Sequence, residues 1–268
     1  MNKKIFFIFL ISIILFSTSC EEDTSVVRKS KGFIITKIED GYPHMPLNIP
    51  AKIYKHSLYH FCYSTNLKAS YWVAYILTKK MVEGQNLNRE NEIFMPDPLL
   101  DKEFSAATND YTRSGYDRGH LCPNGDMNFD QKSMTETFYL SNVLPQKPSF
   151  NRGIWAALEE QVRKWASVND SLYVITGGIF TKKPNFIGKN KIAVPSHFYK
   201  IVADISRKGG YKMIAFVMEN KDYENKNFYQ YAVPVSKIEQ MTGIKFFPSG
   251  DTITIEIFKS TLRLTDWQ

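Results

Sequence analysis

The chain has 268 residues, of which 43% are hydrophobic and 14% aromatic, so it can bury a substantial core. Its 34 basic and 27 acidic residues give a net charge of +7, which modestly favours a polyanionic partner. Three cysteines are too few for a disulfide framework, and the sequence contains no internal repeat or low-complexity segment, which excludes repeat architectures.

The N-terminal sequence predicts export. Lys3 and Lys4 precede an apolar run over 5–16, which is too short to span a bilayer and is typical of a signal sequence. The run ends in small residues before Cys20, as in a lipoprotein signal whose cysteine is lipidated, although Ser17 replaces the usual leucine. Simple secretion, with cleavage at a nearby small residue, is the alternative. The expected organisation is a signal peptide over 1–19, a lipidated N-terminus and tether over 20–45, and one domain over 46–268.

The first predicted elements are two strands at 55–64 and 70–78, which aromatic and β-branched residues dominate and which a polar turn separates. The polar stretch 79–115 is predicted to be a long surface loop with little regular structure. Such loops are uncommon unless they are functional. A short helix is predicted at 130–138, with Asp130 as its cap.

The clearest helix is predicted at 151–166, after a short strand at 139–146. Its apolar residues recur at three- and four-residue spacing, and they are Ile154, Leu158, Val162 and Trp165. Further strands are predicted at 171–177, 198–205 and 211–219.

The C-terminal part is predicted to add a helix at 235–243 and an amphipathic strand at 252–258. Ser236 and Glu239 have the spacing of a capping box, and Gly243 is a typical C-terminal stop. Strands outnumber helices, and many of them are neighbours in sequence. We therefore expect an α+β fold with a mainly antiparallel sheet.

Two stretches carry the candidate catalytic residues. In "YDRGHLCP", His120 follows Arg118 by two positions, and a nearby cation disfavours imidazolium, so Arg118 is expected to keep His120 neutral as a base. Asn151 and Glu159 lie about 80° apart on an ideal helix and offer oxygen ligands of the kind that Mg²⁺ accepts. Asn151 is equally suited to be a helix N-cap, and helical phase alone does not choose between Glu159 and Glu160.

The stretch "YDRGHLCP" followed by "YLSNVLPQKPSFNRGIWAALEEQVR" resembles the DNA/RNA non-specific endonuclease family, the group of endonuclease G and secreted bacterial nucleases. The resemblance covers most of residues 50–260 and implies a ββα-metal nuclease fold. It implies that His120 is the general base and that Asn151 is the direct ligand of Mg²⁺, with Mn²⁺ as an alternative ion. Glu159 would hold the waters around the metal.

The resemblance also implies roles for residues outside this core of three. Asn142 would support the site by hydrogen bonding, and Arg118 would contribute positive charge at the phosphate. Arg89, ahead of "NEIFMPDP", is the best match to a further family arginine, with loose spacing. Asp117 is expected to orient its loop rather than to touch the substrate.

The function that these features predict is Mg²⁺-dependent hydrolysis of DNA and RNA to 5′-phosphate and 3′-hydroxyl ends, with the substrate held through its phosphates. The protein is expected in the bacterial cell envelope, anchored to the membrane by a lipid on Cys20. The alternative is a surface nucleic-acid-binding lipoprotein without activity, against which the intact His120, Asn151 and Glu159 argue.

Two structural alternatives concern the remaining cysteines and histidines. His56 and His60, with the two cysteines, suggest a zinc site, but residues four apart on a strand are about 13 Å distant and do not share one metal. A disulfide between Cys62 and Cys122 is left open by the sequence.

Overall fold

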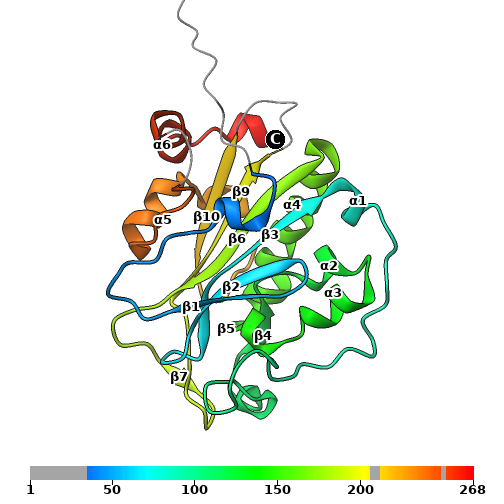
Figure 1. Ribbon diagram of the computed structural model, residues 1–268, viewed down its shortest axis with the longest axis vertical. Coiled ribbons are helices and arrows are strands. Elements are labelled where there is room, and N and C mark those ends of the chain that lie inside the picture. The colour runs from blue at the N-terminus through cyan, green and yellow to red at the C-terminus, as the bar shows by residue number, and fades with distance from the viewer. Residues whose placement is uncertain (1–34, 206–211, 249–251) are drawn as a thin grey trace, which may run out of the picture. The chain divides into compact units, whose positions relative to one another are not determined.

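A seven-stranded sheet, ordered β1-β2-β3-β6-β9-β10-β11, runs through the computed structural model, which describes residues 35–205, 212–248 and 252–268 (Figure 1). Every neighbouring pair of its strands is antiparallel. The strands are β1 (Lys52–Lys55), β2 (Tyr59–Ser64), β3 (Ala69–Thr78), β6 (Ser171–Ile179), β9 (His197–Asp204), β10 (Met213–Glu219) and β11 (Ala232–Val233). The expected α+β class and antiparallel sheet are confirmed.

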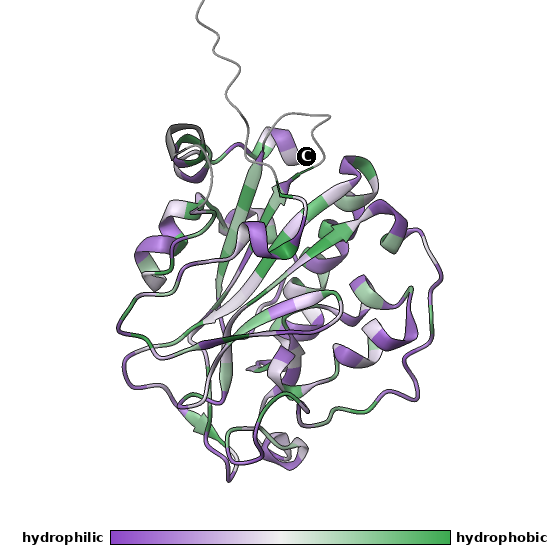
Figure 2. Cartoon of the chain, viewed as in Figure 1, coloured by the Kyte–Doolittle hydropathy of each residue, from purple (hydrophilic) through white to green (hydrophobic). Residues whose placement is uncertain are grey.

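Helices cover both faces of this sheet, because alternate side chains of a strand point to opposite faces. On β3, Val73 packs into one core and Trp72 into the other. The first core lies under α1 (Lys79–Val82), α2 (Asn124–Met127) and α4 (Ala156–Asn169), and the second under α5 (Val235–Thr242) and α6 (Thr252–Ser260). A further short helix, α3 (Gln131–Glu136), follows α2 along the chain. Figure 2 shows hydrophobic residues along the central strands and hydrophilic ones over the helices and loops.

Shorter elements complete the fold. Two-stranded sheets pair β4 (Asp117–His120) with β5 (Val143–Gln146), and β7 (Phe186–Ile187) with β8 (Ile192–Ala193). A π-helical turn, Phe150–Trp155, leads directly into α4. The 3₁₀ turns are Ile38–Gly41, Thr108–Tyr111, Leu140–Asn142, Phe228–Tyr231 and Leu264–Trp267. No helix within the described ranges combines the length and the apolar composition that crossing a membrane requires.

Most predicted elements are present, with shifted ends. The predicted strand at 55–64 divides, because a turn at 56–58 separates β1 from β2. The predicted loop at 79–115 contains only α1 and one 3₁₀ turn. Asp130 caps α3 as expected, since its carboxylate accepts a hydrogen bond from Ser133 N at 2.9 Å.

The predicted strand at 252–258 is wrong, because this segment is the helix α6. Alternating isoleucines suggested a strand, but the helix buries Ile255 and leaves Ile257 53% exposed. Lys259, four positions after Ile255, is also buried and pairs with Glu239 of α5 at 2.7 Å. Packing against α5 therefore overrides the β-propensity of this segment.

The predicted capping box at Ser236 is also wrong. Helix α5 begins at Val235, so Ser236 lies inside the helix; the N-cap residue is Pro234, and no side chain caps the helix. The Glu239 carboxylate instead accepts a hydrogen bond from Phe246 N at 2.9 Å. Gly243 ends the helix in the left-handed conformation, with φ 73°, as predicted.

The described fold begins before residue 46, the predicted start of the domain. Ile35 is buried in the second core, and His44 forms an antiparallel bridge with Lys245. The hydroxyl of Tyr42 is hydrogen-bonded to His60 Nδ1. Residues 35–45, which were expected in the tether, therefore pack on the sheet. The predicted signal peptide and Cys20 lie outside the described residues.

Candidate active site

The sequence "DRGH" forms the strand β4, which pairs with β5 and places His120 opposite Val143. Gly119 leaves room for the buried side chain of Gln146 on β5, because a Cβ at this position would lie 2.1 Å from Gln146 Cδ. A side chain at position 119 would therefore displace that of Gln146. Helix α4 follows β5 along the chain, which completes the ββα arrangement (Figure 1).

Asn142 holds this motif together from behind the site. It is fully buried, its Oδ1 accepts from Cys122 N at 2.8 Å, and its Nδ2 donates to Cys122 O at 2.9 Å and Thr137 O at 2.8 Å. All of these bonds are internal to the scaffold, and Asn142 does not line the cavity that contains His120. Its expected supporting role agrees with this position.

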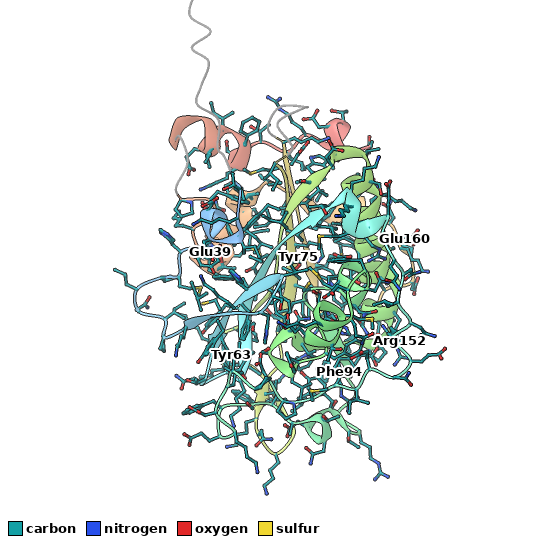
Figure 3. All side chains as sticks on the ribbon, turned by 45° about the vertical axis from the view of Figure 1, so that its right-hand side comes forward. Glu39, Tyr63, Tyr75, Phe94, Arg152 and Glu160 are labelled. Carbon is teal, nitrogen blue, oxygen red and sulfur yellow. The ribbon has the colours of Figure 1, made fainter. Side chains whose placement is uncertain are left out.

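The other sequence-predicted residues meet at one cavity of about 640 Å³. Its lining residues are Arg89, Phe94, Asp117, Arg118, His120, Pro123, Asn124, Gly125, Asn151, Arg152, Ala156, Glu159 and Arg163. Four of these are arginines and two are carboxylates, so the cavity suits an anionic ligand. Figure 3 shows Phe94 and Arg152 on the side of the molecule that α4 occupies.

The π-helical turn changes the angle between Asn151 and Glu159 that an ideal helix would give. Asn151 lies within this wider turn and Glu159 lies on the regular helix α4, so 100° per residue does not apply between them. Both nevertheless line the cavity. Glu160 instead pairs with Lys164 at 2.8 Å, and both of these side chains are more than half exposed. The cavity therefore distinguishes Glu159 from Glu160, which helical phase could not do.

Asp117 fixes the amide of Asn151. Its Oδ2 accepts from Asn151 Nδ2 at 3.0 Å, and its two oxygens accept from Arg152 at 2.7 and 2.6 Å. Partial burial alone would raise the pKa of Asp117, but the bonds from Arg152 and Asn151 outweigh it and lower that pKa. Because the amide nitrogen is committed to Asp117, the amide oxygen is the atom that remains for a cation.

His120 lies between the rings of Phe94 and Phe138, whose centroids are 5.2 and 5.1 Å from its own. This burial, and secondarily the charge of Arg89, lowers the pKa of His120 to about 3. The imidazole is therefore neutral at ordinary pH. The expectation that Arg118 is the responsible cation is wrong, because the nearby charge that acts on His120 is that of Arg89.

Arg118 is fixed by contacts of its own. Its Nη2 donates to Thr108 O at 2.7 Å, and its guanidinium carbon lies 5.6 and 5.5 Å from the ring centroids of Phe94 and Tyr111. These rings fix the guanidinium at the cavity wall, where it can face a phosphate.

The long loop that carries Arg89 and Phe94 is tied down at several points. Met95 N donates to Phe138 O at 3.2 Å, and Leu140 N donates to Met95 O at 2.9 Å. Further along the loop, buried Asp97 accepts from His56 Nε2 at 2.8 Å and from the Ser141 hydroxyl. The loop therefore presents its side chains from a fixed backbone.

Glu159 lines the cavity and interacts with three further charged residues. Burial raises the pKa of Glu159 to about 7, with Lys200 and Arg163 opposing this rise and Asp126 adding to it. Arg163 donates to Asp126 Oδ1 at 3.0 Å. Lys200 is fully buried, donates to Thr176 Oγ1 at 2.6 Å and lies 5.2 Å from the ring centroid of Trp155.

Four further charged residues of the site were not predicted from the sequence, namely Arg152, Arg163, Asp126 and Lys200. Arg163 carries a usable signal, because it lies four positions after Glu159 and so shares its side of the helix. Lys200 interrupts the apolar strand "HFYKIVAD", which also indicates a special environment. Asp126 has no such signal, since only the folded chain brings it to Arg163.

The residues considered for a zinc site, and the two cysteines considered for a disulfide, lie apart. His56 pairs with Asp97 and His60 with Tyr42. Cys62 and Cys122 are buried free thiols in different cores. The disulfide that the sequence left open is therefore not formed.

The donor set of the cavity fits a hard divalent cation. It offers the amide oxygen of Asn151 and the carboxylate of Glu159, and such a cation keeps several waters when the protein supplies few ligands. In the part of the chain that the structure describes, no three His, Cys, Asp or Glu side chains gather into a metal cluster. The cavity therefore offers oxygen ligands, the kind that hard divalent cations prefer.

Comparisons with known proteins agree with this geometry. The family model for DNA/RNA non-specific endonucleases matches residues 41–252. The mitochondrial nuclease of Saccharomyces cerevisiae is 33% identical over 204 residues, which are 69% of this chain and 62% of that protein. Human mitochondrial endonuclease G is 32% identical over 210 residues, covering 74% of this chain and 70% of that protein.

A solved structure extends the agreement to three dimensions. The crystal structure of the EndoG/EndoGI complex aligns with a TM-score of 0.72 and 31% sequence identity, over 80% of this chain and 91% of that chain. The ββα-metal nuclease fold that the sequence predicted is thereby confirmed. With more than half of its length matched by the family model, the chain belongs to the DNA/RNA non-specific endonuclease family.

Proposed function

We propose that this protein is a Mg²⁺-dependent endonuclease that hydrolyses DNA and RNA with little sequence preference. One observation carries the proposal: a single cavity joins a neutral histidine, an oriented amide oxygen, a buried carboxylate and four arginines. Membership of the endonuclease family supports the proposal. The matched regions span 62% of the yeast nuclease and 70% of the human nuclease.

His120 serves as the general base in this proposal. Its Nε2 is buried without a hydrogen-bond partner among the described residues, so Nδ1 is the nitrogen that receives a proton from a water in the cavity. The depressed pKa keeps this imidazole unprotonated when the substrate arrives. The water oxygen then bonds to phosphorus as the bond from phosphorus to the 3′ oxygen opposite breaks, and the departing 3′ oxygen takes up a proton from solvent.

The polar residues around His120 hold the phosphate and the cation. Arg118, fixed between two rings, faces the charge that develops on phosphorus. Asn151 would hold Mg²⁺ through its amide oxygen, Asp117 keeps that amide in place, and Glu159 orients waters beside it. When bound, Mg²⁺ supplies positive charge to the phosphate and to the 3′ oxygen. The products are 5′-phosphate and 3′-hydroxyl ends.

The alternative is a nucleic-acid-binding protein without activity. A plasmid-nicking assay with and without chelator separates the two, because only the proposed enzyme converts supercoiled DNA to the open form in a Mg²⁺-dependent way. Asn151→Ala should shift the Mg²⁺ requirement upward without weakening DNA binding. If excess Mg²⁺ does not rescue it and the midpoint for Mg²⁺ is unchanged, Asn151 is not the ligand.

We further propose export and anchoring to the membrane through a lipid on Cys20, on the basis of the N-terminal sequence. Cys20→Ala should release the protein from the membrane fraction and leave specific activity unchanged. A variant that stays in the membrane fraction would contradict lipidation.

A further inference from the structure

A second hollow, of about 400 Å³, lies beside the catalytic cavity. Its lining residues are Val82, Gln85, Asn86, Gly125, Asn128, Glu160, Arg163, Lys164 and Ser167. Gly125 and Arg163 line both spaces, so the two hollows share a wall. Figure 3 shows Arg152, from the first hollow, and Glu160, from the second, on the α4 side of the molecule.

The shared wall consists of Gly125, which has no side chain, and the cationic Arg163. A Cβ at Gly125 would lie 3.2 Å from Arg163 Nη1, so the absence of a side chain lets the guanidinium lie against the backbone. Asp126 fixes Arg163 with a 3.0 Å bond and is itself held by the Tyr75 hydroxyl at 2.8 Å. An anchored guanidinium therefore stands between the hollows, with 27% of its side chain exposed.

The chemistry of the second hollow suits a sugar–phosphate backbone. Asn128 donates to Asn86 Oδ1, and Leu87 N donates to Asn128 O at 2.8 Å, and these bonds hold the two amides in place in the lining. Lys164 adds a positive charge at the rim, where Glu160 pairs with it. The described lining contains no aromatic ring on which a base could stack, so contacts would go to phosphate and sugar.

We propose that the substrate strand continues from the catalytic cavity across Gly125 into this second hollow. There, Arg163 and Lys164 bind a phosphate that flanks the scissile one. The amides of Asn86 and Asn128 contact the sugar. The inference rests on the proposed nuclease function. It explains how the site gains affinity from neighbouring nucleotides through their phosphates and sugars.

The test compares single-stranded DNA substrates of two lengths, a dinucleotide and a 12-mer of about six nucleotides on each side of the cut. The readout is the ratio of kcat/KM for the 12-mer to that for the dinucleotide. Lys164→Ala removes one charge-assisted contact and should lower this ratio about tenfold. Glu160→Gln frees Lys164 from its partner and should raise the ratio.

Lys237→Ala, on α5 and on the opposite face of the sheet, is the matched control with the same change in charge, and it should leave the ratio unchanged. The second site would be overturned if Lys164→Ala and Lys237→Ala changed the ratio equally. It would also be overturned if the ratio were unchanged in an Asn86→Ala/Lys164→Ala double variant that melts like the wild type. A wild-type protein that cleaves neither substrate would instead overturn the nuclease function itself.

Discussion

Asp117→Asn tests whether a carboxylate behind the cation ligand sets metal affinity. The change keeps the size of the side chain but removes the charge that accepts from Asn151 Nδ2 at 3.0 Å. A hydrogen bond to a charged group contributes about 1.5–3 kcal/mol, and losing partners of this kind weakens metal affinity about 10- to 100-fold. We expect the Mg²⁺ midpoint for plasmid cleavage to rise by this factor and saturating Mg²⁺ to restore much of the rate.

The same carboxylate also binds Arg152, so Arg152→Gln is the control. The Arg152 side chain is 73% exposed, and solvent screening leaves its ion pair with little effect on stability. Arg152→Gln keeps the bond between Asp117 and Asn151, so it should raise KM for nucleic acid and leave the Mg²⁺ midpoint in place. An unchanged midpoint in Asp117→Asn, or the same midpoint shift in both variants, would refute the reasoning.

Four further outcomes are expected. His120→Ala should lose about 10²- to 10⁴-fold in rate with DNA affinity retained, and activity within about tenfold of wild type would exclude His120 as the base. Because the pKa of His120 is lowered to about 3, an NMR titration of the wild type should show no protonation of His120 near pH 6.5. Arg89→Ala should raise the pKa of His120, and an unchanged pKa would exclude Arg89 as a cause. The pKa of Glu159 is raised to about 7, so protons compete with Mg²⁺ below that pH. The Mg²⁺ midpoint should therefore rise by up to about tenfold per pH unit as pH falls, and Glu159→Gln should lose this dependence. Duplex binding should weaken with salt at a slope near −0.9 per phosphate contacted, and a flat response would contradict recognition through phosphates.

The sequence was sufficient for those parts of the site that one short segment determines. The pair of strands at β2 and β3 followed from composition, and His120, Asn151 and Glu159 were identified from the resemblance of their motifs to those of the DNA/RNA non-specific endonuclease family. All three line one cavity. Local patterns work here because each motif is one strand or one helix, whose geometry its own residues largely fix.

Predictions failed where distant segments decide the outcome. Helix α6 forms because Lys259 and Ile255 are buried against α5, which the alternation of its isoleucines does not reveal. The cation that acts on His120 is not its sequence neighbour but Arg89, which a loop brings from thirty-one residues upstream. Arg163 likewise depends on Asp126, which only the folded chain places beside it.

End-group analysis of the products tests the central claim most directly, namely that His120 activates a water beside a cation at Asn151. Wild-type protein with Mg²⁺ should leave 5′-phosphate and 3′-hydroxyl ends on both DNA and RNA after a short digest, and chelator should stop both reactions. A water nucleophile does not need the 2′-hydroxyl, so no 2′,3′-cyclic phosphate should form on RNA. Cyclic phosphate ends, or cleavage of RNA alone that survives chelation, would contradict both the role of His120 and the metal site.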